Sequence, residues 1–367
     1  MRSLLIALTV IAACAAPPAA ADADRMLAAG GEHIDAAGAL AVPRASHSAT
    51  LLPDGAVLIA GGYDGACGIA TTELFEPASG KTLPGPKLTV PRCSHSATAL
   101  ADGRVLLAGG WSGADVVASA ELYDPRTLTF TPAAPMKDAR AAHVAVTLAD
   151  GRVLVAGGSD GSGMMADAEL YDSATGAWTR TGSLGIPRVA ATAVRLADGT
   201  VLVAGGSPRR GEVVATAELF DPAAGTFAAT GPLTIARHKH AATLLPDGNV
   251  LVVGGSDARD GRGQYSASEI YDARARTFSA TADMRAPRFK LPDAVATLTG
   301  GEVLVAGGGV QAEVFDPVKR TFRVVAGSLG ARRSFSTATV LRDGRVLVAG
   351  GYDENIRVSG ALFLYRR

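Results

Sequence analysis

The chain has 367 residues, 44 of them glycine, and its length allows two average domains or one large all-β domain. A hydrophobic fraction of 48% with only 19% charged residues excludes an intrinsically disordered chain. The 35 basic residues balance 35 acidic ones, and aromatic residues make up only 5%, which argues against a basic or base-stacking surface for nucleic acid.

The first residues have the features of a secretory signal peptide. A basic start, Met1–Arg2, precedes an apolar stretch over Leu4–Ala13, and Ala19–Ala21 fit a small-residue cleavage site. The sequence therefore predicts a signal peptide over residues 1–21 and export to the periplasm or out of the cell. Because the apolar stretch is too short to span a membrane, we expect no transmembrane helix in the mature chain.

A second kind of export signal overlaps with the first. Ile11–Cys14 is similar to a bacterial lipoprotein box, in which the signal ends before Cys14 and that cysteine becomes the lipidated N-terminus. The mature protein would then be a membrane-anchored lipoprotein. In either case residues 22–31 form a short linker.

A Gly-Gly pair recurs seven times after the linker, at steps of 43 to 53 residues. Its first glycines are Gly61, Gly109, Gly157, Gly205, Gly254, Gly307 and Gly350. Each pair follows a short apolar run such as Val57–Ala60, which predicts a strand buried on both faces. A dipeptide such as Asp54-Gly55 precedes each run, with Gly300-Gly301 in the sixth unit, and predicts a tight hairpin with another strand.

The segment after each Gly-Gly pair predicts two further strands. A glutamate opens the third strand in six units: Glu73, Glu121, Glu169, Glu218, Glu269 and Glu313. One bulky residue marks the fourth strand: Leu83, Phe130, Trp178, Phe227, Phe278 and Phe322. Each unit is therefore predicted to be a sheet of four antiparallel strands.

These motifs closely resemble the kelch repeat, over roughly residues 32–365. Because one such sheet buries both faces only by stacking on neighbours around an axis, we predict an all-β, seven-bladed kelch-type β-propeller. It forms a single domain over residues 32–367. The seventh unit ends after one strand, Ala361–Tyr365, so residues near Glu32–Ala36 should supply its missing outer strand and close the ring.

The loops after the Gly-Gly pairs share one face of such a propeller with the loops that lead into the inner strands. Positive residues gather there over the fourth to sixth units and suggest an anionic ligand, such as an acidic sugar or a carboxylate. The candidate ligand-binding residues are Arg209, Arg210, Lys239, Arg259, Arg262, Tyr265, Arg288, Lys290 and Arg333. Alternatively, these loop charges are simply solvated and bind no ligand, and Asp257 and Asp260 partly cancel them.

An arginine recurs just before each inner strand: Arg44, Arg92, Arg140, Arg188, Arg237, Arg288 and Arg333. A ring of guanidinium groups would suit an anion at the mouth of the channel. One arginine and one third-strand glutamate per unit favour internal ion pairs instead. The seventh unit has Ala361 where the glutamate is expected, which leaves Arg333, or Arg332 beside it, free to bind a ligand.

Four of these arginines are followed, three positions later, by a histidine: His47, His95, His143 and His240. They suggest either a metal site at the channel mouth or structural hydrogen bonds within the repeat. Because Ala191 interrupts the set and no carboxylate or cysteine completes it, we predict no metal site.

Cys67 and Cys93 map to one face of adjacent blades. We predict a disulfide between them in an oxidising compartment, and two separate thiols are the alternative.

No enzyme motif is recognisable: the chain has no Gly-x-Ser-x-Gly elbow, phosphate-binding loop or zinc-protease helix. Galactose oxidase resembles this chain in propeller type, but its copper is held by two tyrosines and two histidines beside a Tyr–Cys crosslink, and no Tyr-His dipeptide occurs here. The periplasmic sialate mutarotase is similar in length and export, but no motif maps residue by residue. We therefore transfer no catalytic role and expect no cofactor.

These observations favour an exported, monomeric module that binds a glycan or an envelope or extracellular protein, with no nucleic-acid partner. The alternatives are a sugar-active enzyme on the same scaffold and a purely architectural surface protein.

Overall fold

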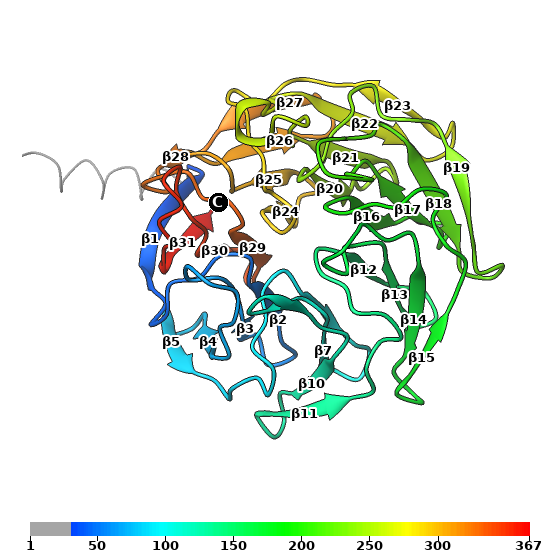
Figure 1. Cartoon of the computed structure of the whole chain (residues 1–367). Helices are drawn as coiled ribbons and strands as arrows, with labels where there is room; N and C mark the ends of the chain where they lie inside the picture. The colour runs from blue at the N-terminus through cyan, green and yellow to red at the C-terminus, as the bar shows by residue number, and fades with distance from the viewer. Residues whose placement is uncertain (1–30) are drawn as a thin grey trace, which may run out of the picture.

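The structure, a computed structural model, describes residues 31–367. Seven β-sheets form a ring around a central channel, and the chain passes from each sheet to the next (Figure 1). The predicted signal peptide, the alternative lipidation site Cys14 and nearly all of the linker lie outside the described residues. Between residues 31 and 367 no helix is long and apolar enough to cross a membrane.

Six sheets are blades of four consecutive antiparallel strands, with the first strand of each next to the channel. The first three blades are β2 (Ser48–Leu51), β3 (Val57–Ala60), β4 (Thr72–Glu76) and β5 (Lys81–Pro84); β6 (Ser96–Ala99), β7 (Val105–Ala108), β10 (Ala120–Asp124) and β11 (Thr129–Ala133); and β12 (Val144–Thr147), β13 (Val153–Ala156), β14 (Ala168–Asp172) and β15 (Ala177–Arg180).

The next three blades are β16 (Thr192–Arg195), β17 (Val201–Ala204), β18 (Ala217–Asp221) and β19 (Thr226–Thr230); β20 (Ala241–Leu244), β21 (Val250–Val253), β22 (Ser268–Asp272) and β23 (Thr277–Ala280); and β24 (Val295–Thr297), β25 (Val303–Val305), β26 (Glu313–Asp316) and β27 (Thr321–Val324). The post-Gly-Gly loops add a small hairpin, β8 (Trp111–Ser112) with β9 (Asp115–Val116), and a 3₁₀ helix, η1 (Asp260–Arg262).

The seventh blade joins the two ends of the described chain. From the channel outward it consists of β29 (Thr337–Val340), β30 (Val346–Ala349), β31 (Ala361–Arg366), β1 (His33–Ala39) and β28 (Ala326–Gly327). Antiparallel pairing places Ile34 opposite Tyr365, and β28 adds a short parallel strand at the outer edge. The predicted closure by the N-terminal segment is confirmed, and the prediction of seven four-stranded blades is confirmed with it.

The hydrophobic core is divided into seven clusters, one between each pair of neighbouring blades. Between the second and third blades, for example, Leu106 packs with Val153, Val155 and Tyr171. Tyr171 also stacks on Trp178 of the adjacent outer strand, with ring centroids 5.0 Å apart. A single blade therefore has no complete core of its own, which is why the sheets stack in a ring.

The first blade differs from the predicted pattern at its outer strand. Phe75 pairs with Thr82, where the next blade has Phe130 opposite Tyr123. Leu83, the bulky residue of this strand, lies in β5 as predicted and is 44% exposed. Leu83 pairs with Leu74, one position away from the aromatic pair of the next blade, and because side chains alternate along a strand, this offset places the leucine on the other face.

The predicted ion pairs between the recurring arginines and glutamates are confirmed in six blades. The distances between Nη2 and Oε1 are 3.1 Å for Arg44–Glu73, 3.0 Å for Arg92–Glu121, 3.0 Å for Arg140–Glu169, 2.8 Å for Arg188–Glu218, 2.8 Å for Arg237–Glu269 and 2.7 Å for Arg288–Glu313. Each arginine also donates from Nη1 to the first carbonyl of the Gly-Gly pair, as Arg92 does to Gly109 at 2.7 Å. These buried pairs therefore connect the inner-strand loop of each blade to its third strand.

Candidate functional site

The inner strands β2, β6, β12, β16, β20, β24 and β29 contact one another in a ring and enclose the central channel (Figure 1). The channel contains a cavity of about 680 Å³, lined largely by alanine, serine and threonine. This volume is within the range of small-molecule binding sites. In the described part of the chain, the charged side chains that line the cavity are Arg210, Lys239 and Asp293.

One rim of the channel is a ring of backbone hydrogen bonds between blades. In every blade the residue two positions after the recurring arginine has a positive φ of 50° to 60°: Ser46, Ser94, Ala142, Ala190, Lys239, Lys290 and Phe335. Its N–H donates to the matching carbonyl of the preceding blade, as from Ser94 to Ser46 at 3.0 Å. In the sixth blade Leu291 donates instead, to Lys239 at 3.2 Å. The rim backbone is therefore tied together around the whole channel.

The four recurring histidines connect neighbouring blades. Their Nε2 atoms lie at hydrogen-bond distance from a hydroxyl of the preceding blade: 3.1 Å for His47 and Thr337, 3.0 Å for His95 and Ser48, 2.9 Å for His143 and Ser96, and 2.9 Å for His240 and Thr192. Burial, together with a nearby arginine, lowers the pKa of His47 and His143 to about 3, so both are neutral at pH 7. In residues 31–367 no three His, Cys, Asp or Glu side chains are grouped to hold a metal ion.

Asp260 brings part of the predicted basic sector together beside the rim. Its carboxylate lies 2.7 Å from Lys239 Nζ and 3.9 Å from Lys290 Nζ, and 3.6 Å from Nε2 of His238. Burial raises the pKa of Asp260, but the hydrogen bond and charge of Lys239 and the charge of Lys290 outweigh it, and the pKa is lowered. The carboxylate therefore anchors the η1 loop to the rim and neutralises part of the local positive charge.

Lys290 is also held by aromatic rings. Its Nζ lies 4.6 Å from the ring centroid of Phe289, 5.7 Å from that of Phe335 and 5.2 Å from that of Tyr352. Burial lowers the pKa of Lys290, and Asp260 opposes the shift. These contacts are cation–π interactions, so the Lys290 ammonium is bound by side chains of the protein itself.

Arg210 is a predicted residue that the structure places at the cavity. It is exposed, lines the cavity from the loop of the fourth blade, and forms no hydrogen bond or ion pair with other described residues. Lys239 lines the same cavity from the next blade. The structure therefore brings these two cations to the channel mouth.

Four other predicted residues lie on the same face but outside the cavity. Arg209 pairs with Glu212, and Arg259 pairs with Asp257 at 2.6 Å. Tyr265 lies 5.6 Å from the guanidinium of Arg237, measured to its ring centroid. Arg262 is exposed at the end of η1. The three arginines are therefore solvated or internally paired, which agrees with the alternative interpretation given by the sequence, namely loop charge without a ligand.

Two predicted residues are buried elsewhere, and we leave them out of the site. Arg288 is 1% exposed and paired with Glu313, as the repeat requires. Arg333 is 8% exposed, donates from Nε to the Leu329 carbonyl at 3.0 Å, and has its guanidinium 5.5 Å from the ring centroid of Phe363. Lacking a glutamate partner, this arginine packs on an aromatic ring rather than turning to the channel.

Asp293 was not among the predicted site residues. The first Gly-Gly carbonyl lies 17 residues after the recurring arginine in the first five blades, but 19 residues after Arg288. The two extra residues, Pro292 and Asp293, form a turn that Ala294 closes with a hydrogen bond to Leu291 at 2.8 Å. The turn faces the channel, and its side chains contact the cavity.

The Asp293 carboxyl has an unusual environment. The side chain is exposed to solvent in the channel, and desolvation by the surrounding channel wall raises its pKa to about 6. Among residues 31–367 no donor forms a hydrogen bond with the carboxylate. In the sequence, the spacing of 19 residues between Arg288 and Gly307, instead of 17, is the feature that could have identified Asp293.

A disulfide joins Cys67 and Cys93, whose Cα atoms are 5.3 Å apart. The same loops share backbone hydrogen bonds, from Gly113 to the Cys67 carbonyl at 2.7 Å and from Cys93 to the Trp111 carbonyl at 2.9 Å. The bridge therefore ties the first two blades together on the face that carries the channel mouth.

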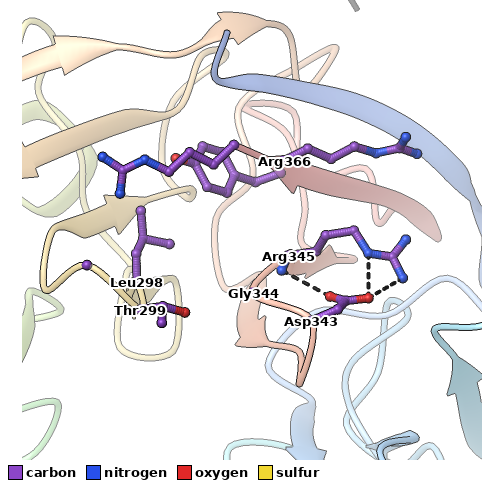
Figure 2. Close-up of a pocket in the computed structure, with 9 residues that line it drawn as sticks. Leu298, Thr299, Asp343, Gly344, Arg345 and Arg366 are labelled. Carbon is purple, nitrogen blue, oxygen red and sulfur yellow. Dashed lines mark hydrogen bonds and ion pairs between the residues drawn. The ribbon is translucent and has the colours of Figure 1, made fainter. Parts of the chain in front are cut away.

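A smaller cavity of about 360 Å³ lies on the opposite face, between the hairpin turns of the last two blades. Figure 2 shows Leu298 and Thr299 on one side and the hydrogen-bonded pair of Asp343 and Arg345 on the other. Arg367, which also lines it, pairs with Glu302 at 2.5 Å. Because these charges are already paired, this cavity is a weaker candidate than the channel.

The repeated Gly-Gly strand ends, the buried Arg–Glu pairs and the seven stacked blades define a kelch-repeat β-propeller. The family model of the Kelch motif matches residues 92–137 and 140–185. The matched motifs and the ring of blades together support a kelch-repeat propeller. No curated protein matches the chain.

Solved structures extend the similarity to almost the whole ring. A fungal alcohol oxidase of the AA5 family, in complex with copper, is 18% identical with a TM-score of 0.73, over 92% of this chain and 76% of that one. The protein YjhT is 11% identical with a TM-score of 0.61, over 90% of this chain and 99% of that one. At these identities the similarity establishes the fold.

The described residues do not fit a copper centre of the galactose oxidase kind. Cys67 and Cys93 are consumed in the disulfide, so neither is available for a Tyr–Cys crosslink. The inner-strand histidines use Nε2 on hydroxyls of neighbouring blades, and no metal-binding group of three side chains is formed within residues 31–367.

Proposed function

We propose that this kelch propeller is a binding module that takes a small glycan into the mouth of its central channel. The observation that carries the proposal is the 680 Å³ cavity, which has a hydroxyl-rich wall, two cations at the mouth and one carboxyl inside. Sugars are recognised by many hydrogen bonds to hydroxyls and amides, and these walls offer several hydroxyl groups.

The rigidity of the rim supports a binding role. The backbone hydrogen bonds of the rim and the disulfide on the same face hold the loops in position before a ligand arrives. A preformed site loses little conformational entropy on binding. The disulfide also supports our proposal that the protein is exported to an oxidising compartment.

The test is a glycan array followed by isothermal titration calorimetry of each positive glycan. Arg210→Ala removes a cation that the fold does not use, so we expect intact folding and at least about tenfold weaker binding of acidic glycans. Arg274→Ala, in the turn between β22 and β23 on the opposite face, is the matched control and should bind normally. No binding to any glycan, or equal binding by both variants, would overturn the proposal.

A sugar-active enzyme is the second candidate, because the pKa of Asp293 near 6 suits proton transfer at neutral pH. An anomer-exchange or sugar-oxidation assay tests this directly. Turnover that Asp293→Asn abolishes would favour the enzyme, whereas tight binding without turnover would favour the binding module.

A further inference from the structure

We propose that the cavity recognises a saccharide with a free amino group, whose ammonium pairs with Asp293 while the rest of the ligand extends toward Arg210 and Lys239. This inference rests on the proposed glycan-binding function and specifies the class of glycan. It follows from the position of Asp293, which supplies the one carboxyl among the described residues that line the cavity.

The position of Asp293 is built by the fold. In the sixth blade the extra residues interrupt the inner strand, so β24 is one residue shorter than β20 and β29 on either side. The neighbouring β29 holds the turn in place, because Ala338 N–H donates to the Asp293 carbonyl at 2.7 Å. The backbone of Asp293 is thereby fixed beside the channel, and its side chain lines the cavity.

The surroundings leave the carboxylate without a counter-charge. The flanking strands present Ala242 and Thr243 from β20 and Thr337 and Ala338 from β29 to the cavity, and none of these side chains titrates in the physiological range. Lys239 is already 2.7 Å from Asp260, and the inner-strand histidines are neutral. A cationic ligand group would therefore meet an acid that is exposed to the channel and has no counter-charge among the described residues.

The cavity offers both an acid and a free cation. Asp293 and Arg210 both line it, and Arg210 forms no ion pair with another described residue, so an amine and an acidic substituent on one ligand would each find an opposite charge. An N-acetylated sugar cannot form the ion pair, because its amide carries no charge. Discrimination between free and acetylated amines is thus the specific consequence of this arrangement.

The experiment compares an oligosaccharide of glucosamine with its fully N-acetylated counterpart by calorimetry at pH 6.5, where the sugar amine is largely protonated and Asp293 is mostly ionised. We expect the amine form to bind at least about tenfold more tightly. Asp293→Asn should remove that preference, while Asp115→Asn, an exposed position in the β8–β9 hairpin outside the cavity, should keep it.

The outcomes separate the two proposals. If neither sugar binds and the array is also blank, glycan binding itself fails. If the N-acetylated sugar binds as well as the amine, or if Asp293→Asn retains the preference, glycan binding stands and the ammonium subsite is wrong. Circular dichroism of each variant confirms that a loss of preference occurs in folded protein.

Discussion

Arg140 and Glu169 lie 3.0 Å apart inside the third blade, and neither side chain is accessible to solvent. Glu169 also accepts the backbone N–H groups of Lys137 and Asp138 at 2.7 and 3.1 Å. The glutamate thus binds both the guanidinium and a loop of the same blade. The glutamates of five other blades do the same, with two loop N–H groups in three of them and one in the blades of Glu218 and Glu313.

Replacing one member of such a pair should be costly. Glu169→Gln removes the buried counter-charge of Arg140 and leaves only the more distant Asp138, 3.7 Å away, so we expect the free energy of unfolding in urea to fall by about 3 kcal/mol. Glu212→Gln, which removes the exposed partner of Arg209, is the control and should change stability by less than about 1 kcal/mol. Equal stability of the two variants would show that the buried pairs contribute nothing.

The stability of the protein should depend on pH through Asp293. The pKa of this carboxyl rises from 3.8 to about 6 on folding, so the folded chain holds a proton that the unfolded chain has released between these values. Stability therefore falls as pH rises through this window. Because solvent in the channel screens the charge, the loss above pH 6 should be about 1–2 kcal/mol.

The variant Asp293→Asn lacks this titration and isolates its contribution. We expect it to melt at a higher temperature than the unsubstituted protein at pH 7.5 and at a similar temperature at pH 3.5, measured by scanning calorimetry. A lower melting temperature at pH 7.5 would mean that the carboxylate stabilises the fold rather than serving a ligand.

The disulfide should make a separate contribution. Because the bridge closes a segment of 26 residues, Cys67→Ser with Cys93→Ser should lower the free energy of unfolding by about 3 kcal/mol. A reductant should lower the melting temperature of the unsubstituted protein toward that of the double variant and leave the variant unchanged. Free thiols at both positions in unfolded, unreduced protein would contradict the bridge.

Closure of the ring can be tested at Ile34, which is 2% exposed in β1 and pairs with Tyr365. Ile34→Asp places a charge in the cluster between the sixth and seventh blades, and the free energy of unfolding should drop by more than about 3 kcal/mol. The control is Asp35→Asn on the same strand, whose side chain is partly exposed. If both variants melt alike, β1 is dispensable for closure.

The repeat made most of the fold predictable. Regular spacing of glycines, glutamates and apolar runs determined blade number, strand order and the internal ion pairs, because each of these depends on residue types that recur. The closing strand was also predictable, since the seventh unit visibly lacked one.

The functional face was less predictable, because its features do not depend on recurring residue types. The rim hydrogen bonds are formed by backbone groups of serine, alanine, lysine and phenylalanine alike. The insertion before Ala294 can be counted in the sequence, but whether it turns Asp293 into the channel or away from it depends on the neighbouring strands. Lys290, Arg288 and Arg210 are all positively charged loop residues in the sequence. Only the structure shows that Arg288 pairs with Glu313 and Lys290 packs on aromatic rings, whereas Arg210 lines the cavity.

The pairing of β1 with β31 has a consequence for how the chain reaches its native state. The first strand of the described chain cannot find its partner until the last one has been synthesised, so an incomplete chain carries unpaired strand edges at both ends of an open arc. The seventh blade can therefore form only from a chain that includes β31. A chain shortened before Ala361 would keep six intact blades, but its exposed strand edges could pair with those of another chain.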